Sequence, residues 1–173
     1  MKVDITKSAS ANLLAALNLD NVGLNATEAQ VTFGLPSVVS GTAGRNTQVT
    51  ITAVANQGFA GTKDVTYTRQ ALVAGEGIAT AKAVSVLIVA GDTDAQVLTK
   101  VATALGLVES EVSLANIVRP VDESTPGSAD VVADTDSLLY TGTFAAVLTV
   151  ADADVSLEDA ITTDELNSFE AEG

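Results

Sequence analysis

The chain repeats one pattern of elements at an interval of 81 to 84 residues. Residues 27–33 align with residues 108–114 at a shift of 81, and residues 2–5 align with residues 86–89 at a shift of 84. The difference of three residues falls between a helix and the next strand, where loops tolerate insertions. A period of this length predicts two copies of one small unit. The alternative is that two short αβ units share a common pattern without being copies.

Each half is predicted to begin with a strand that is followed by a helix. The strands are expected at residues 2–5 and 84–90. In the second half, Asp92 or Thr93 is the expected N-cap of the helix and Gly106 its expected end. Apolar residues at helical spacing form a stripe on each helix. The stripes comprise Ala9, Leu13, Ala16 and Leu17 in the first half, and Val97, Leu98, Val101, Ala102 and Leu105 in the second.

Antiparallel strands are predicted to complete each half. Apolar side chains alternate with threonines along residues 49–53 and 65–69, which is typical of a sheet with one face in solvent. A glycine-containing loop at residues 56–61 is expected to join these two strands. Shorter strands are expected at residues 31–33 and 112–117, and a loop rich in glycine and proline follows the first of them.

These elements predict an α+β fold with two tandem small modules, each a strand–helix unit followed by antiparallel strands. The first β-rich module spans residues 1–73, and the second, a weak internal repeat of the first, spans residues 74–151. Residues 70–83 are expected to link the modules. Residues 152–173 form an acidic tail, in which two capping-box patterns predict a helix.

Six threonines are expected to share one surface of the first module. They are Thr47, Thr50, Thr52, Thr62, Thr66 and Thr68. Threonine is common on strands that face solvent, and a flat threonine-rich sheet can also pack edge to edge with another subunit. Both interpretations stay open at this point.

The chain contains no histidine and no cysteine. Histidine is the commonest general acid or base near neutral pH, so catalytic triads, cysteine nucleophiles and histidine–metal sites are excluded. Disulfide bonds are excluded for the same reason. Catalysis by carboxylates alone and the binding of a hard cation by oxygen ligands are the chemistries that remain.

Four groups of carboxylates could serve such chemistry. They are Asp152 with Asp154, Asp130 with Asp134 and Asp136, Asp92 with Asp94, and Glu109 with Glu111. The first pair begins like a calcium-binding loop, but Leu157 stands where that loop needs glycine. The other groups fit solvated strand faces or the positive end of a helix dipole. We therefore predict no catalytic, cofactor-binding or metal-binding residue, no cofactor, and a protein that is not an enzyme.

The net charge of −14 lies in the C-terminal part of the chain. Residues 1–100 hold seven acidic and seven basic residues, whereas residues 101–173 hold fifteen acidic residues and only Arg119 as a base. Such a surface repels nucleic acids and anionic membranes, so neither is an expected partner. With four Phe, two Tyr and no Trp, the chain has few aromatic anchors for a ligand, and no small-molecule substrate is expected. The N-terminus does not have the form of a signal peptide, which predicts synthesis in a bacterial cytoplasm without secretion.

Several short segments resemble small virion structural proteins of large contractile-tailed bacteriophages. They are residues 1–13, residues 30–36, Phe59-Ala60-Gly61 and Tyr67-Thr68-Arg69. The resemblance covers most of the first module and, more weakly, residues 140–161. It implies no catalytic residue, a location in the virion, and partners that are protein subunits of the same assembly, namely major capsid or tail proteins or copies of the chain itself.

Within this class, a head decoration or capsid-associated protein is the leading interpretation. A tail-tube or neck component of the same particle is the alternative, since tube subunits also use sheets that continue from copy to copy. A receptor- or glycan-binding adhesin module is an alternative of another class. The shortage of tryptophan and tyrosine, the residues that stack on sugars and anchor interfaces, counts against it.

Overall fold

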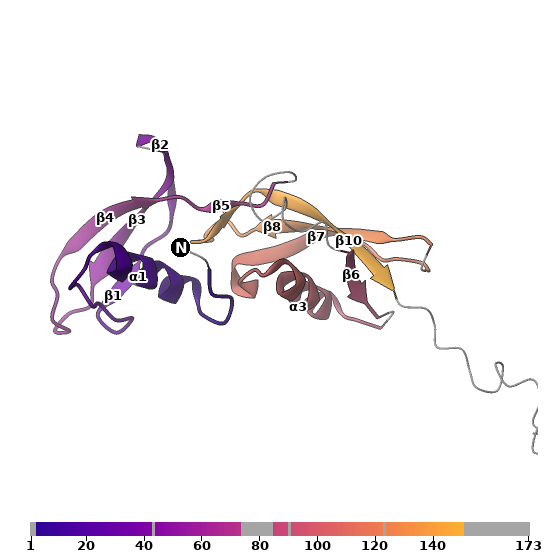
Figure 1. The fold of residues 1–173 in the computed structure, drawn as a ribbon, viewed down its shortest axis with the longest axis horizontal. Helices are drawn as coiled ribbons and strands as arrows, with labels where there is room; N and C mark the ends of the chain where they lie inside the picture. The colour runs from indigo at the N-terminus through magenta and orange to yellow at the C-terminus, as the bar shows by residue number, and fades with distance from the viewer. Residues whose placement is uncertain (1–2, 43, 74–84, 90, 123, 151–173) are drawn as a thin grey trace, which may run out of the picture.

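The computed structural model describes residues 3–42, 44–73, 85–89, 91–122 and 124–150. Helices and strands are mixed along the chain (Figure 1), which confirms the predicted α+β class. The elements are α1 (Ala9–Asp20), β1 (Val31–Phe33), β2 (Ser37–Thr42), β3 (Arg45–Ala53), β4 (Thr62–Tyr67), β5 (Gln70–Ala71), β6 (Ser85–Ile88), α3 (Asp94–Leu105), the 3₁₀ helix η1 (Glu109–Glu111), β7 (Val112–Val118), β8 (Gly127–Ala133), β9 (Tyr140–Thr141) and β10 (Thr143–Val150). Neither described helix is long and apolar enough to cross a membrane.

The first sheet is antiparallel and centres on β3. Both β1 and β2 pair with one edge of β3, and β4 pairs with the other edge. Along β3 the odd-numbered Thr47, Val49 and Ile51 are buried, while Thr50 and Thr52 are exposed. The threonine-rich surface is therefore real except at Thr47, because the period of two in a strand turns this side chain to the inner face.

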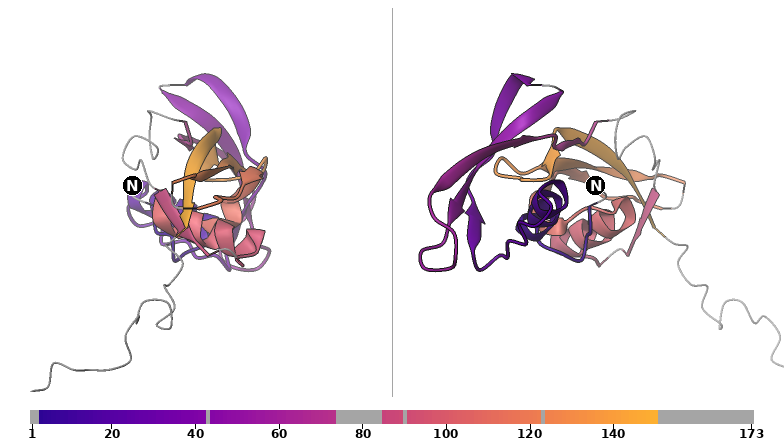
Figure 2. Two further views of the ribbon diagram at one scale, coloured as in Figure 1. Left: turned by 90° about the vertical axis from the view of Figure 1, so that its right-hand side faces the viewer. Right: turned by 60° about the vertical axis from the view of Figure 1, so that its left-hand side comes forward.

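Strand β2 lies in a segment that was predicted to be a loop. Residues 37–42 pair with β3 instead, and the two strands project from the body as a ribbon, which Figure 2 shows. The exposed fraction of Val38 is 81 %, so the ribbon leaves no burial pattern in the sequence. Backbone pairing alone forms this strand, and hydrophobic patterning could not predict it.

The second sheet has the strand order β6-β10-β8-β7. Strand β6 runs parallel to β10, whereas the other neighbours are antiparallel. Helix α3 lies on one face of this sheet (Figures 1 and 2) and buries Val97 and Val101 in the same cluster as Val86 and Ile88 of β6. In the described part of the chain, no helix covers the other face.

The strands of the two sheets begin at matching positions. The start of β1 at Val31 and the start of β7 at Val112 are 81 residues apart, and the same interval separates Thr62 of β4 from Thr143 of β10. Register matches as well, since Thr52 lies opposite Thr62 and Val132 lies opposite Thr143. The second sheet has β6 beside β10, whereas among the described residues β4 pairs with β3 only.

The strand predicted at residues 2–5 is wrong for its described residues, 3–5, which form no ladder. The backbone N–H of Asp4 donates to Asn12 Oδ1 at 2.8 Å, and Asn12 Nδ2 donates to the carbonyl of Asp4 at 2.9 Å. A buried side chain amide on α1 thus takes the hydrogen bonds that a neighbouring strand would provide. Asn12 lies beside the predicted apolar stripe of α1 and is only 1 % exposed.

Helix caps follow the sequence closely. Ser8 accepts from the N–H of Ala11 at the start of α1. Of the two candidates for α3, Thr93 is the N-cap, and it forms a capping box with Gln96. Gly106 ends α3 in the left-handed conformation, with a φ of 67°, as predicted.

The two halves share a small sheet and part of one core. Strand β5 pairs in parallel with β9, and the N–H of Leu72 donates to the carbonyl of Thr141 at 2.7 Å. Leu72 and Ala9 both lie in the larger hydrophobic cluster, which otherwise belongs to the second half. The linker predicted from residue 70 therefore begins too early, because Leu72 gains more from burial than a solvated linker residue would. Residues 74–83 and the predicted C-terminal helix lie outside the described residues.

Candidate interaction site

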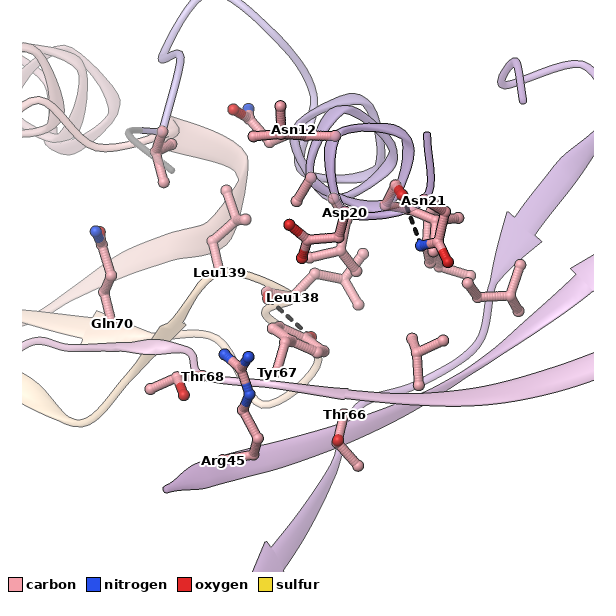
Figure 3. A pocket seen from close by; sticks show the side chains of 18 residues that line it. Asn12, Asp20, Asn21, Arg45, Thr66, Tyr67, Thr68, Gln70, Leu138 and Leu139 are labelled. Atoms are coloured by element: carbon pink, nitrogen blue, oxygen red, sulfur yellow. Dashed lines mark hydrogen bonds between the residues drawn. The ribbon is translucent and has the colours of Figure 1, made fainter. Parts of the chain in front are cut away.

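A cavity of about 570 Å³ lies between α1 and the inner face of the first sheet. Its walls come from α1, from β3 and β4, and from the loop before β9, and they are mainly apolar. Figure 3 shows Asn12 and Asp20 on the helix side and Tyr67 and Arg45 on the strand side. A second cavity of about 320 Å³ shares Leu17, Asn21, Ile51 and Val65 with the first, so the two form one groove. We call it the α1–β4 groove.

Most polar groups of the α1–β4 groove are already bonded within the chain. The Asn12 amide serves the backbone of Asp4, Asn21 Nδ2 donates to the carbonyl of Leu17 at 2.8 Å, and the Tyr67 hydroxyl donates to the carbonyl of Leu138 at 2.9 Å. Burial raises the pKa of Tyr67 to about 12, so this hydroxyl stays protonated at neutral pH. The groove thus offers an apolar surface to a partner rather than an acid–base pair.

A polar junction closes one end of the groove and joins the halves. Arg69 is 8 % exposed, its Nε donates to Thr47 Oγ1 at 2.9 Å, and its Nη1 donates to the carbonyl of Ser137 at 2.9 Å. On the other side, Glu111 Oε2 accepts from the hydroxyl of Ser137 at 2.9 Å and from the N–H of Leu138 at 2.6 Å. The opposite charges of Arg69 and Glu111 hold the same loop from two sides.

Sequence reasoning missed this junction. Glu111 was predicted to be a surface residue, and that is wrong, because its carboxylate binds the loop at residues 137–139. Arg69 was noted only as part of an alternating strand. The contacts join residues that lie 26 to 68 positions apart, and no local pattern encodes such a separation.

The uncovered face of the second sheet carries an apolar stripe. Leu87 and Val118 are each 58 % exposed, and Val147 is 44 % exposed. The strand registers place all three side chains on this face, since Val147 and Val118 both lie opposite Ser128, and Leu87 lies opposite Thr149. We call Leu87, Val118 and Val147 the apolar stripe. A surface of this kind is suited to packing against another protein.

The structure disperses the carboxylates that sequence analysis considered. Asp130 accepts a hydrogen bond from Asn116 Nδ2 at 2.8 Å, and Asp134 is held through its backbone by Glu111. Asp94 pairs with Arg119 near the start of α3. Within the described ranges, no three acidic side chains are grouped in a way that could hold a metal ion. Asp152 and Asp154 lie outside the described residues.

Asp92 forms the most shielded ion pair among the described residues, with Lys100 of α3. Hydrogen bonds from the Lys100 ammonium and from the N–H of Val89 hold the pKa of Asp92 below its usual value of 3.8. A carboxyl whose pKa is depressed by folding stabilises the fold above its unfolded pKa, and this contribution is lost as the pH falls through the folded value.

The stability cost of Asp92→Asn is therefore expected to depend on pH. The difference in free energy of unfolding between wild type and variant should be full at neutral pH and should shrink below the ordinary pKa of 3.8. Urea unfolding at neutral pH and at about pH 3 measures it. Lys100→Met, which removes the main partner, should reduce the same pH dependence. A difference that stays constant over this range would contradict the assignment.

Comparisons with known proteins identify a family but no activity. A search of curated proteins and a search of solved structures found no match to the chain. The model of one protein family, described as a family of unknown function (DUF7941), matches residues 2–171. Because this match covers nearly the whole chain, the protein belongs to the DUF7941 family.

Proposed function

We propose that this protein is a non-enzymatic structural subunit of a bacteriophage virion that decorates the head by binding major capsid proteins. The apolar stripe carries the proposal, because exposed apolar side chains gathered on an uncovered sheet face favour a protein-binding surface. The resemblance of residues 1–13 and 30–36 to small virion proteins supports the location in the particle. The acidic C-terminal part of the chain favours a partner with a basic surface.

We also infer that the fold consists of two tandem modules, residues 1–73 and 74–151, followed by an acidic helical tail. The equal spacing of strand starts, 81 residues between β1 and β7 and between β4 and β10, supports this architecture. The matching registers of the central strands β3 and β8 support it too. Two similar modules would give one chain two related surfaces for an assembly.

Replacing two residues of the apolar stripe with charged ones should abolish docking onto the particle. We expect the double variant Leu87→Asp, Val147→Asp to bind purified capsids that lack this protein at least about tenfold more weakly than wild type. Both side chains are already half exposed, so folding should survive the change. Co-sedimentation with capsids measures binding, and the melting temperature checks the fold.

Thr52→Asp is the matched control, since it puts the same charge on the exposed face of the other sheet. This variant should bind capsids like wild type. If the double variant binds equally well, the apolar stripe is not the contact surface. If mass spectrometry finds no copies of the protein in purified virions, the proposed function itself is wrong.

The edges of β4 and β6 favour a second position in the same particle, the tail tube or neck. Neither edge pairs with another strand in the described part of the chain, and tube subunits join their sheets through such edges. A tube protein should polymerise into rings or fibres by itself. A decoration protein should stay a monomer or a small oligomer until capsids are added.

A further inference from the structure

We propose that the α1–β4 groove binds the C-terminal segment of a second copy of this chain, which adds a strand to the edge of β4. The inference deepens the proposed role in an assembly and rests on its tandem-module architecture. It assigns a self-association site that is separate from the apolar stripe, because the groove lies in the first half and the stripe in the second.

The first sheet lacks a strand that the second sheet possesses. In the second half, β6 pairs in parallel with β10 and buries Val86 and Ile88, which are 3 % and 1 % exposed. Strand β4 is the counterpart of β10, and in the described residues its far edge has no partner. The backbone groups along that edge are therefore open to an added strand.

The helix side of the groove corresponds to the helix side of the filled site. Val97 and Val101 of α3 pack in one cluster with β6 in the second half. The residues 85 positions earlier are Asn12 and Ala16, and both line the cavity under α1. The surface that covers β6 in one half thus faces open space in the other.

The strand side corresponds in the same way. Ala146 and Leu148 of β10 are 1 % and 0 % exposed beside β6. The residues 81 positions earlier are Val65 and Tyr67 of β4, which are half-buried and line the cavity. An added strand would find room for inward-facing side chains there, as Val86 and Ile88 do in the second sheet.

The N-terminal segment of the same chain does not occupy this position. Val3 reaches the rim of the cavity, but the backbone of Asp4 is bonded in both directions to Asn12 on α1. These bonds fix the segment on the helix and leave the edge of β4 unpaired.

The C-terminal segment has the pattern that the groove requires. From Ala151 to Leu157, alanine, valine and leucine at odd positions alternate with aspartate and serine at even positions. As an added strand, this segment would place Ala153, Val155 and Leu157 in the groove and its polar side chains in solvent.

Charge favours the same occupant. Residues 151–173 hold eight acidic residues and no basic one, whereas residues 1–73 hold five basic and four acidic residues. Arg45 and Lys63 line the groove, and neither forms an ion pair with any described residue. An acidic strand would meet these two cations at the groove.

The position of β10 favours a second copy over the tail of the same molecule. Strand β10 ends at Val150, at the far end of the molecule from β4 and α1, in both Figure 1 and the right-hand view of Figure 2. The tail of a neighbouring copy can enter the groove directly. Such a head-to-tail contact gives a ring if the rotation closes and a fibre if it does not.

Analytical ultracentrifugation of the full chain tests the inference without capsids. Wild type should self-associate in a concentration-dependent manner. Ala16→Trp, which fills the groove, and Val155→Asp, which breaks the apolar alternation of the tail, should each weaken association at least about tenfold. Ala15→Trp on the exposed side of α1 and Ser156→Asp on the polar side of the tail are the matched controls and should stay within about twofold.

Mixing the two blocked variants distinguishes exchange between copies from docking within one copy. Ala16→Trp retains an intact tail and Val155→Asp an intact groove, so their mixture should form dimers while each alone stays monomeric. The inference is overturned if wild type is monomeric throughout, if the controls weaken association equally, or if the mixture stays monomeric. Capsid binding through the apolar stripe is measured separately, so either proposal can fail alone.

Discussion

Gly127→Ala is expected to destabilise the protein by about 3 kcal/mol, the largest effect of any single methyl group in this fold. A Cβ at Gly127 would lie 2.1 Å from the carbonyl oxygen of Val118 and 2.6 Å from the backbone nitrogen of Pro120. Both atoms belong to the backbone, so no side chain can move aside. The turn between β7 and β8 must open, or the pairing of Val118 with Ser128 must break. Thermal unfolding should report a drop in melting temperature of roughly 6–12 °C.

Gly91→Ala serves as the matched control for this change. A Cβ at Gly91 would meet nothing within 4 Å, and its backbone conformation is open to other residues. The control should change the free energy of unfolding by no more than about 1 kcal/mol. Equal stability of the two variants would mean that the β7–β8 turn relaxes freely, which the structure does not allow.

Arg69→Ala is expected to cost about 2–4 kcal/mol by breaking the polar junction between the halves. The change leaves the Thr47 hydroxyl and the Ser137 carbonyl without their donor in a buried place. It also leaves Glu111, which binds the same loop, without the nearby positive charge. Urea unfolding measures the loss, and hydrogen exchange should show faster exchange at residues 137–140.

Arg45→Ala is the control for Arg69→Ala, because Arg45 is exposed and forms no ion pair with a described residue. Its effect on stability should stay within about 0.5 kcal/mol. Arg69→Lys should recover part of the loss, since an ammonium can replace one of the two hydrogen bonds. An Arg69→Ala variant as stable as the control would show that the junction contributes nothing to folding.

Local patterns predicted the elements whose cause is local. The strand at residues 31–33 and the helix cap at Thr93 with its end at Gly106 lie where the sequence places them. Alternation along residues 49–53 also assigned Val49 and Ile51 to the inside and Thr50 and Thr52 to the outside. Each of these features depends on neighbours a few residues away, and such neighbours are visible in the sequence.

The candidate groove could not be predicted in this way. The alternation of Val3 and Ile5 indicates a strand as well as that of Val86 and Ile88 does, yet only the second pair lies in one. The outcome depends on Asn12, which binds the backbone of Asp4 and keeps it away from β4. A strand needs a partner edge to satisfy its backbone, and the sequence does not state which partner is within reach.

By itself, the sequence determined the α+β class, the absence of histidine and cysteine chemistry, and the accumulation of negative charge towards the C-terminus, because these follow from composition and short-range periodicity. Only the tertiary structure decided that Arg69 and Glu111 grip one loop, that Leu72 enters the core of the other half, and that β4 keeps an open edge beside a cavity. These outcomes join residues that are distant in the chain, and their free energy comes from desolvation and backbone pairing between segments rather than from either segment alone.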